Sequence, residues 1–148
     1  MKSFRFSLQR VLDWRALLMR REEEKLGGLQ IKLAGIVHRE NALLAAQVKS
    51  ESELLGLEAI HGSDLRALAA FQLRMQSERA SLKVTRIQCE TQIVEQRKRL
   101  LQARRDHTVL EKLKEKRLRT WSYLSDREIE ETAAEAYISK WARNESEG

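Results

Sequence analysis

The side chains with the clearest capacity for interaction are cations concentrated in the second half of the chain. Residues 97–119, named here the basic belt, contain Arg97, Lys98, Arg99, Arg104, Arg105, Lys112, Lys114, Lys116, Arg117 and Arg119. From Asp126 onward the sign reverses and acidic residues predominate. Such a belt can bind an acidic protein surface or nucleic acid, or it can be a solvated helix face with internal ion pairs. Because the belt lacks aromatic side chains for base stacking, we expect a protein partner rather than nucleic acid.

Side chains that catalyse reactions or hold metals form no recognisable motif. Cys89 is the only cysteine, and His38, His61 and His107 lie far apart in the sequence. Glycine-rich phosphate loops, metal-spaced Cys/His clusters and nucleophile elbows are all missing from the sequence. A lone thiol usually serves as a small apolar filler. We therefore expect no enzymatic activity, cofactor or metal site.

Composition favours long helices. The 148 residues include no proline, six glycines, 34% charged residues and 5% aromatics. Residues with high helix propensity dominate, as is typical of coiled coils. No apolar run approaches the roughly 18 residues of a membrane-spanning helix. Charges at Arg5, Arg10 and Asp13 argue against a signal peptide, so we expect a cytoplasmic protein.

Apolar residues recur at alternating steps of three and four in both halves of the chain. The row in the first half includes Leu26, Leu29, Leu33, Ile36, Leu43, Leu54 and Leu57. The row in the second half includes Leu68, Met75, Leu82, Cys89, Ile93, Leu100, Leu110 and Trp121. This spacing keeps one stripe of each helix facing a partner helix, which predicts a left-handed coiled coil.

The best break between the two rows is residues 61–64. Gly62 suits the left-handed position after a helix end, and Ser63 or Asp64 can cap the next helix. A short connection between long helices makes them antiparallel neighbours. We therefore predict one all-α domain, residues 1–148, folded as a long antiparallel two-helix coiled-coil hairpin. The expected bounds are a helix at about 4–61, a turn at about 62–64, a helix at about 64–141 and a frayed tail at 142–148.

Polar residues interrupt the expected seam between the helices. They are Glu40, Gln47, Arg79, Arg86, Gln96, His107, Lys114 and Arg117. Polar seam residues define register and lower stability. Two interpretations stay open: a solvated hairpin whose long side chains reach water, and a flexible hairpin completed by a partner.

Aromatic residues concentrate where an antiparallel hairpin would bring both chain ends together. They are Phe4, Phe6, Trp14, Trp121, Tyr123, Tyr137 and Trp141, and we expect them to form a cluster at the open end. At the opposite end, Phe71 with Leu68, Leu73 and Met75 could form an exposed apolar docking patch.

Two segments resemble the FliJ family of flagellar export proteins. One is residues 4–12, FRFSLQRVL, followed by Arg15. The other is residues 110–117, LEKLKEKR, with Trp121 and an acidic stretch at 128–135 after it. The length and two-helix layout agree with that family over nearly the whole chain. The aromatic contacts of the family near residues 43–50 are missing here.

The resemblance implies a cytoplasmic component of the bacterial flagellar type III export apparatus, held at the inner face of the cell membrane through its partners. Family members fold like the coiled coil of a rotary-ATPase gamma subunit, insert into the hexameric export ATPase and bind the cytoplasmic domain of the membrane export-gate protein. Export substrates or their chaperones are further candidate partners. The ATPase-docking residues implied are Phe4, Leu8, Arg15, Lys112, Lys116 and Arg117. The gate-docking residues implied are Leu68, Phe71 and Met75.

Two alternatives remain. The chain could be the corresponding stalk of a virulence-type secretion system, or a structural coiled coil that self-associates.

Overall fold

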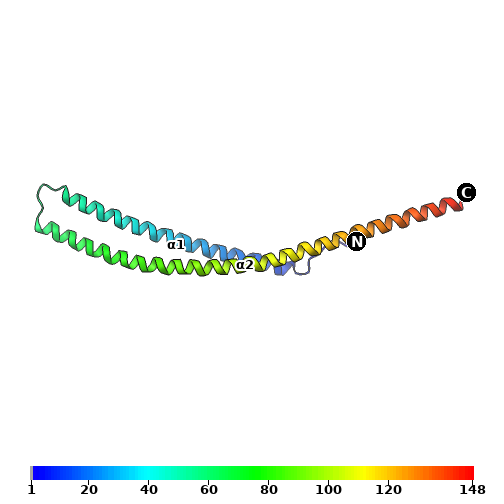
Figure 1. The fold of residues 1–148 in the computed structure, drawn as a ribbon, viewed down its shortest axis with the longest axis horizontal. Coiled ribbons are helices and arrows are strands. Elements are labelled where there is room, and N and C mark those ends of the chain that lie inside the picture. Colours follow the sequence, from blue (N-terminus) through cyan, green and yellow to red (C-terminus); the bar gives the residue numbers. More distant parts are fainter. Residues whose placement is uncertain (1) are drawn as a thin grey trace. The chain divides into compact units, whose positions relative to one another are not determined.

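The computed structural model describes residues 2–148 as two long helices, α1 (Gln9–Leu55) and α2 (Gly62–Ser146), with no strand in this range (Figure 1). The all-α prediction is confirmed. None of the described helices has an apolar stretch long enough to cross a membrane. The chain divides into two compact units: residues up to Met19 with Ala103–Gly148, and Arg20–Gln102.

Within the Arg20–Gln102 unit the two helices run antiparallel. The Gln96 amide of α2 contacts Glu22 near one end of the unit, and Gln72 contacts Glu51 near the other. Residue numbers therefore fall along α2 as they rise along α1, as predicted for a hairpin. The other unit shows the same order by itself, since Ser7 contacts Arg117 and Arg15 contacts Asp106.

The core of the Arg20–Gln102 unit lies along the predicted seam. Ile36, Cys89 and Ile93 form a buried cluster. Half-buried seam leucines pack around it, namely Leu26, Leu29, Leu33 and Leu82. Cys89 is only 1% exposed, and its Sγ lies 3.5 Å from the Leu29 carbonyl oxygen. The thiol occupies the place of a small apolar seam residue, as expected from the sequence.

Three of the polar seam residues in this unit, Gln96, Glu40 and Arg86, find partners across the interface. The Gln96 side chain is 5% exposed and donates from Nε2 to both the carbonyl oxygen and the carboxylate of Glu22. Arg86 Nε lies 3.1 Å from Glu40 Oε1, although the two atoms are not aligned as a hydrogen bond. The seam is therefore interrupted by cross-helix polar pairs, which favour one register over its neighbours.

The hydrogen bond from Gln96 is the main cause that lowers the pKa of Glu22 below its ordinary value of 4.5. Partial burial opposes the shift, and Lys25 adds to it. Because the folded-state pKa is lowered, ionised Glu22 stabilises the fold fully above its unfolded-state pKa. This contribution is lost as the pH falls through the folded-state value.

We expect Glu22→Gln to reduce the free energy of unfolding by about 1 kcal/mol at pH 7, because a neutral acceptor replaces a charged one. The difference from the wild type should shrink as the pH falls below about 4.5. Urea unfolding followed by circular dichroism at several pH values measures it. Glu24→Gln, at an exposed position of the same helix, is the control and should follow the wild-type profile. A constant difference across the pH range would contradict this account of Glu22.

The expected start of the first helix, at about residue 4, is wrong. Residues 2–6 are not helical, Ser7 and Leu8 form a turn, and α1 begins at Gln9. The Gln9 N–H donates to the Phe6 carbonyl oxygen at 3.1 Å and closes this turn. Phe6 is buried all the same, so its apolar side chain packs from a non-helical segment rather than from a helix face.

The expected turn at about 62–64 is also misplaced. The first helix ends at Leu55, not about 61, and residues 56–61 form the connecting loop. Gly62 is the first residue of α2, and no described glycine has a positive φ. The His61 carbonyl oxygen accepts from Asp64 N, while Asp64 Oδ2 accepts from His61 N at 3.0 Å. Asp64 thus caps α2 by reaching back to the preceding backbone. The far end of α2 extends to Ser146, beyond the predicted bound of about 141.

Three glycines weaken α1 without a packing reason. A Cβ atom added at Gly27, Gly28 or Gly35 would meet nothing within 4 Å. Glycine inside a helix costs up to about 1 kcal/mol relative to alanine. We expect Gly27→Ala with Gly28→Ala to raise the free energy of unfolding by about 1–2 kcal/mol, measured by urea unfolding. A destabilised double variant would show that the backbone near these residues needs the freedom of glycine.

Candidate docking surfaces

The N-terminal segment is held against α2 by aromatic and polar contacts. The Phe4 and Trp121 ring centroids lie 6.0 Å apart, and Trp121 Nε1 donates to the Lys2 carbonyl oxygen at 3.2 Å. Phe6 is buried under the Arg117 guanidinium, whose carbon lies 5.6 Å from the ring centroid. A cation over an aromatic face is attracted by the ring quadrupole. These contacts attach the non-helical N-terminal segment to one side of α2 (Figure 1).

Arg117 therefore has an internal role. Besides covering Phe6, it donates from Nη1 to Ser7 Oγ at 2.8 Å. Phe4 and Leu8, also implied in ATPase docking, are half-buried, as is Arg15. The Arg15 Nη1 lies 3.3 Å from Asp106 Oδ2 on α2. Three of the six residues implied by the resemblance, Phe4, Arg15 and Arg117, thus make contacts that hold the N-terminal segment and α1 on α2.

Cations of the same unit form a separate exposed row on α2. They are Arg105, Lys112, Lys116 and Arg119, named here the basic stripe, and all four are exposed. Their spacing of seven, four and three places them on one helix face. That face points away from the seam positions Leu110, Lys114 and Trp121, which are half-buried. Arg119 makes only a long ion pair, 3.9 Å, with Glu115.

The remaining cations of the basic belt are distributed differently. Arg97, Lys98 and Arg99 are exposed but belong to the Arg20–Gln102 unit. Lys98 pairs with Glu95 at 3.3 Å, so part of the belt is a solvated face with internal ion pairs. Sequence reasoning gave the belt as one surface and included Arg117. The helical spacing of the belt residues is enough to separate the cations of the basic stripe from the residues on the seam side of the helix.

The predicted aromatic cluster is smaller than expected. Among the described residues, Phe4 and Trp121 form the ring pair at this end, and Phe6 is buried beneath Arg117. The other aromatic residues are exposed, namely Trp14, Tyr123, Tyr137 and Trp141. From Asp126 onward every described residue is exposed. The non-helical N-terminal segment reaches Trp121 but does not cover the later turns of α2.

Near the loop, the predicted gate-docking residues are not the most exposed apolar side chains. Leu68, Phe71 and Met75 are all half-buried. Exposed apolar side chains nearby are Leu55, Leu57, Ile60, Leu65 and Leu73. Leu57 and Ile60 were missed because the sequence places them on a helix that in fact ends at Leu55. The apolar surface of this end is therefore carried mainly by the loop and its flanking residues.

Comparisons with known proteins do not extend this picture. The resemblance to the FliJ family rests on the two quoted segments and stays a prediction. The chain matches no protein-family model, no curated protein and no solved structure.

Proposed function

We propose that this chain is a non-enzymatic docking stalk of the bacterial flagellar type III export apparatus, binding the ring of the export ATPase. The observation that carries the proposal is the basic stripe, a row of exposed cations on the face of α2 that turns away from the seam. Two paired helices provide a rigid support for such a row. The resemblance of residues 4–12 and 110–117 to the FliJ family supplies the identity of the partner.

The basic stripe predicts an acidic surface on the ATPase. Complementary charge increases the association rate and orients the partners more than it raises final affinity. Exposed charges are screened over about 8 Å at physiological ionic strength, so the contact should weaken in salt.

The second partner in this proposal is the cytoplasmic domain of the membrane export-gate protein. Apolar side chains around the loop, including Leu57 and Ile60, are exposed and suit contact with another protein. The half-buried side chains of this end would pack beneath the exposed ones, namely Leu68, Phe71 and Met75. The chain would then be cytoplasmic and peripheral to the membrane, held there by its partners.

Self-association is the second candidate function. Large apolar side chains outside both proposed docking surfaces are also exposed, including Ile31 at 76% and Val48 at 66%. Sedimentation of the purified chain separates the candidates, because a structural coiled coil forms stable oligomers and a stalk stays largely monomeric. A stalk of a virulence-type secretion system shares the same physical features and differs only in its ATPase.

Binding of the full chain to a purified flagellar export ATPase tests the proposal. We expect saturable binding by biolayer interferometry that weakens when the salt concentration rises. The homologous ATPase of a virulence-type system serves as the comparison. Absence of binding to the flagellar enzyme at low salt would overturn the proposal.

A further inference from the structure

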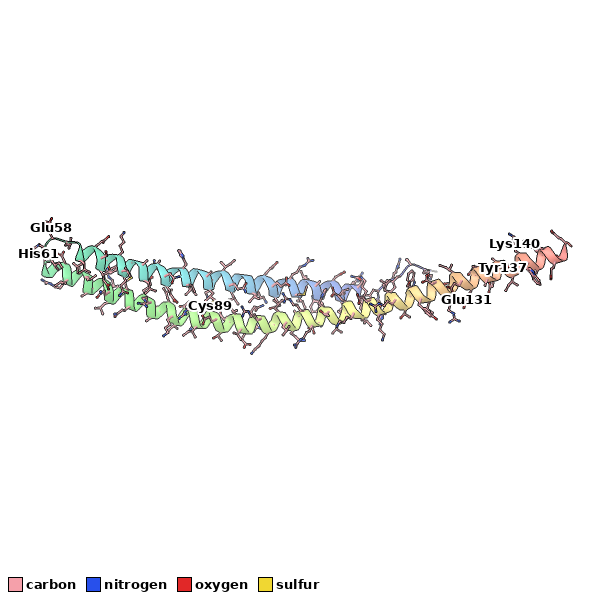
Figure 2. All side chains as sticks on the ribbon, turned by 45° about the horizontal axis from the view of Figure 1, so that its top comes forward. Glu58, His61, Cys89, Glu131, Tyr137 and Lys140 are labelled. Carbon is pink, nitrogen blue, oxygen red and sulfur yellow. The ribbon has the colours of Figure 1, made fainter. Side chains whose placement is uncertain are left out.

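The last part of α2 continues as a helix without an internal partner helix. In its unit, the N-terminal segment contacts α2 as far as Trp121, and every described residue from Asp126 onward is exposed. The helix nevertheless extends to Ser146, a stretch on which Glu131, Tyr137 and Lys140 are marked in Figure 2. Helices in proteins are stabilised mostly by packing one face against another element. The stretch from Asp126 to Ser146 has no such element in this chain's described residues.

One face of this stretch continues the seam. Steps of four and three lead from Trp121 to Ser125, Glu128, Thr132 and onward. A groove of about 720 Å³ follows this face and is lined by Ser3, Trp121, Ser125, Glu128, Ile129, Thr132, Ala133 and Ala136. Ile129 is 64% exposed and provides an apolar contact point. The small side chains beside it leave room for the larger side chains of a second helix.

The sides of the groove are acidic. Glu128 and Glu135, seven residues apart, follow one edge, and Asp126 lies toward the other edge. Arg127 is the only cation between residues 126 and 139, and it already pairs with Glu131 at 2.9 Å. This acidic surface stands out on a chain whose net charge is +6.

These features distinguish between possible occupants. A second copy of the same stretch would place acidic flanks against acidic flanks, and like charges across an interface are unfavourable. A helix with an apolar stripe bordered by lysine or arginine satisfies both the groove and its edges. Helices of this kind bind grooves through side chains spaced by three and four residues.

We propose that the face of α2 from Trp121 to Ala136 binds an amphipathic helix with basic flanks from another protein. The incoming helix takes the place that α1 occupies along the earlier seam. This surface lies on the seam side of α2, and the basic stripe lies on the opposite side. The two surfaces therefore bind partners of opposite charge, and the new site does not depend on the proposed ATPase contact.

A designed peptide tests the site on the full-length chain. The probe is a fluorescent, helix-forming peptide of about 21 residues with a leucine stripe bordered by lysine and arginine, measured by anisotropy. One matched peptide carries glutamate at the flanks, and another has the same composition as the probe in scrambled order. We expect the probe to bind at least tenfold more tightly than either matched peptide.

Matched variants locate the binding. Ile129→Gln with Ala136→Gln removes the apolar contact point and fills the groove without changing charge. Ile138→Gln with Ala134→Gln makes the same replacements on the opposite face, where Ile138 is 63% exposed. The groove variant should weaken probe binding at least tenfold, and the control should leave it unchanged; circular dichroism should report equal helicity for both.

Several results would overturn the proposal. They are undetectable probe binding, equal loss in both variants, and equal binding of the scrambled or acidic peptide. Sedimentation of the full chain tests whether the occupant is a second copy of the chain. If the chain dimerises and only the groove variant abolishes the dimer, the occupant is a second copy and the proposed partner is wrong. In none of these cases is the proposed ATPase contact affected, because the basic stripe is unaltered.

Discussion

Replacing Ile93 with alanine is expected to lower the free energy of unfolding by about 2–5 kcal/mol, the usual cost of emptying a buried aliphatic site. Ile93 is 5% exposed and belongs to the cluster with Ile36 and Cys89 that joins α1 to α2. A seam between two helices has few layers of buried side chains. One cavity therefore removes a large share of the contact that holds the hairpin closed.

Ile87→Ala provides the matched control for this prediction. Ile87 lies on the same helix, loses the same atoms and is 50% exposed. Its replacement should change stability by less than about 1 kcal/mol, since alanine also favours the helix. Urea unfolding followed at 222 nm compares the two variants. Similar losses for both would mean that the helices do not meet along the Ile36–Ile93 face.

Reversing the charge of the basic stripe is the second prediction with a large effect. Lys112→Glu, Lys116→Glu and Arg119→Glu together should weaken ATPase binding about 10–100-fold, because each places like charge against the expected acidic surface. Circular dichroism should show little change, since all three side chains are exposed and away from the seam. Glutamine at the same positions should give a smaller loss.

A second triple variant controls for the change in net charge. Lys32, Arg74 and Lys83 are exposed in the Arg20–Gln102 unit, and changing them to glutamate alters the net charge by the same amount. This variant should retain nearly wild-type affinity if binding is local to the basic stripe. Equal losses in the two triple variants would indicate a general attraction between a basic chain and an acidic partner.

The seam could be predicted from the sequence because its signal repeats many times. Positions such as Leu29, Ile36, Leu43 and Ile93 recur at the coiled-coil spacing, and all are buried or half-buried. A chance substitution at one position does not hide a pattern of this length. The antiparallel order followed from a connection too short to allow any other arrangement.

The ends of the helices could not be predicted in the same way, because each depends on a single local event. Leu57 extends the spacing from Leu54, so the apolar pattern runs through the real end of α1. The sequence places Phe4 and Phe6 in the first turn of a helix, although they lie in a non-helical segment. The apolar pattern predicts that a side chain is buried, but it does not predict which backbone conformation buries that side chain.

Partners of polar seam residues were also beyond the sequence. Gln96 was expected to interrupt the seam, but Glu22 lies outside the predicted apolar row and could not be matched to it. The pairing depends on the register, and the register depends on the loop at residues 56–61. For the same reason the sequence placed Arg117 in the basic belt with the other cations, although its side chain covers Phe6.

A photoreactive amino acid at position 116, in cells that assemble flagella, tests the central claim most directly. Lys116 lies in the basic stripe and is exposed, so the account predicts a cross-link to the export ATPase after irradiation. The same probe at Lys83, in the other unit, should give none. A cross-link from position 116 only to a second copy of the chain, or equal ATPase cross-links from both positions, would contradict the account.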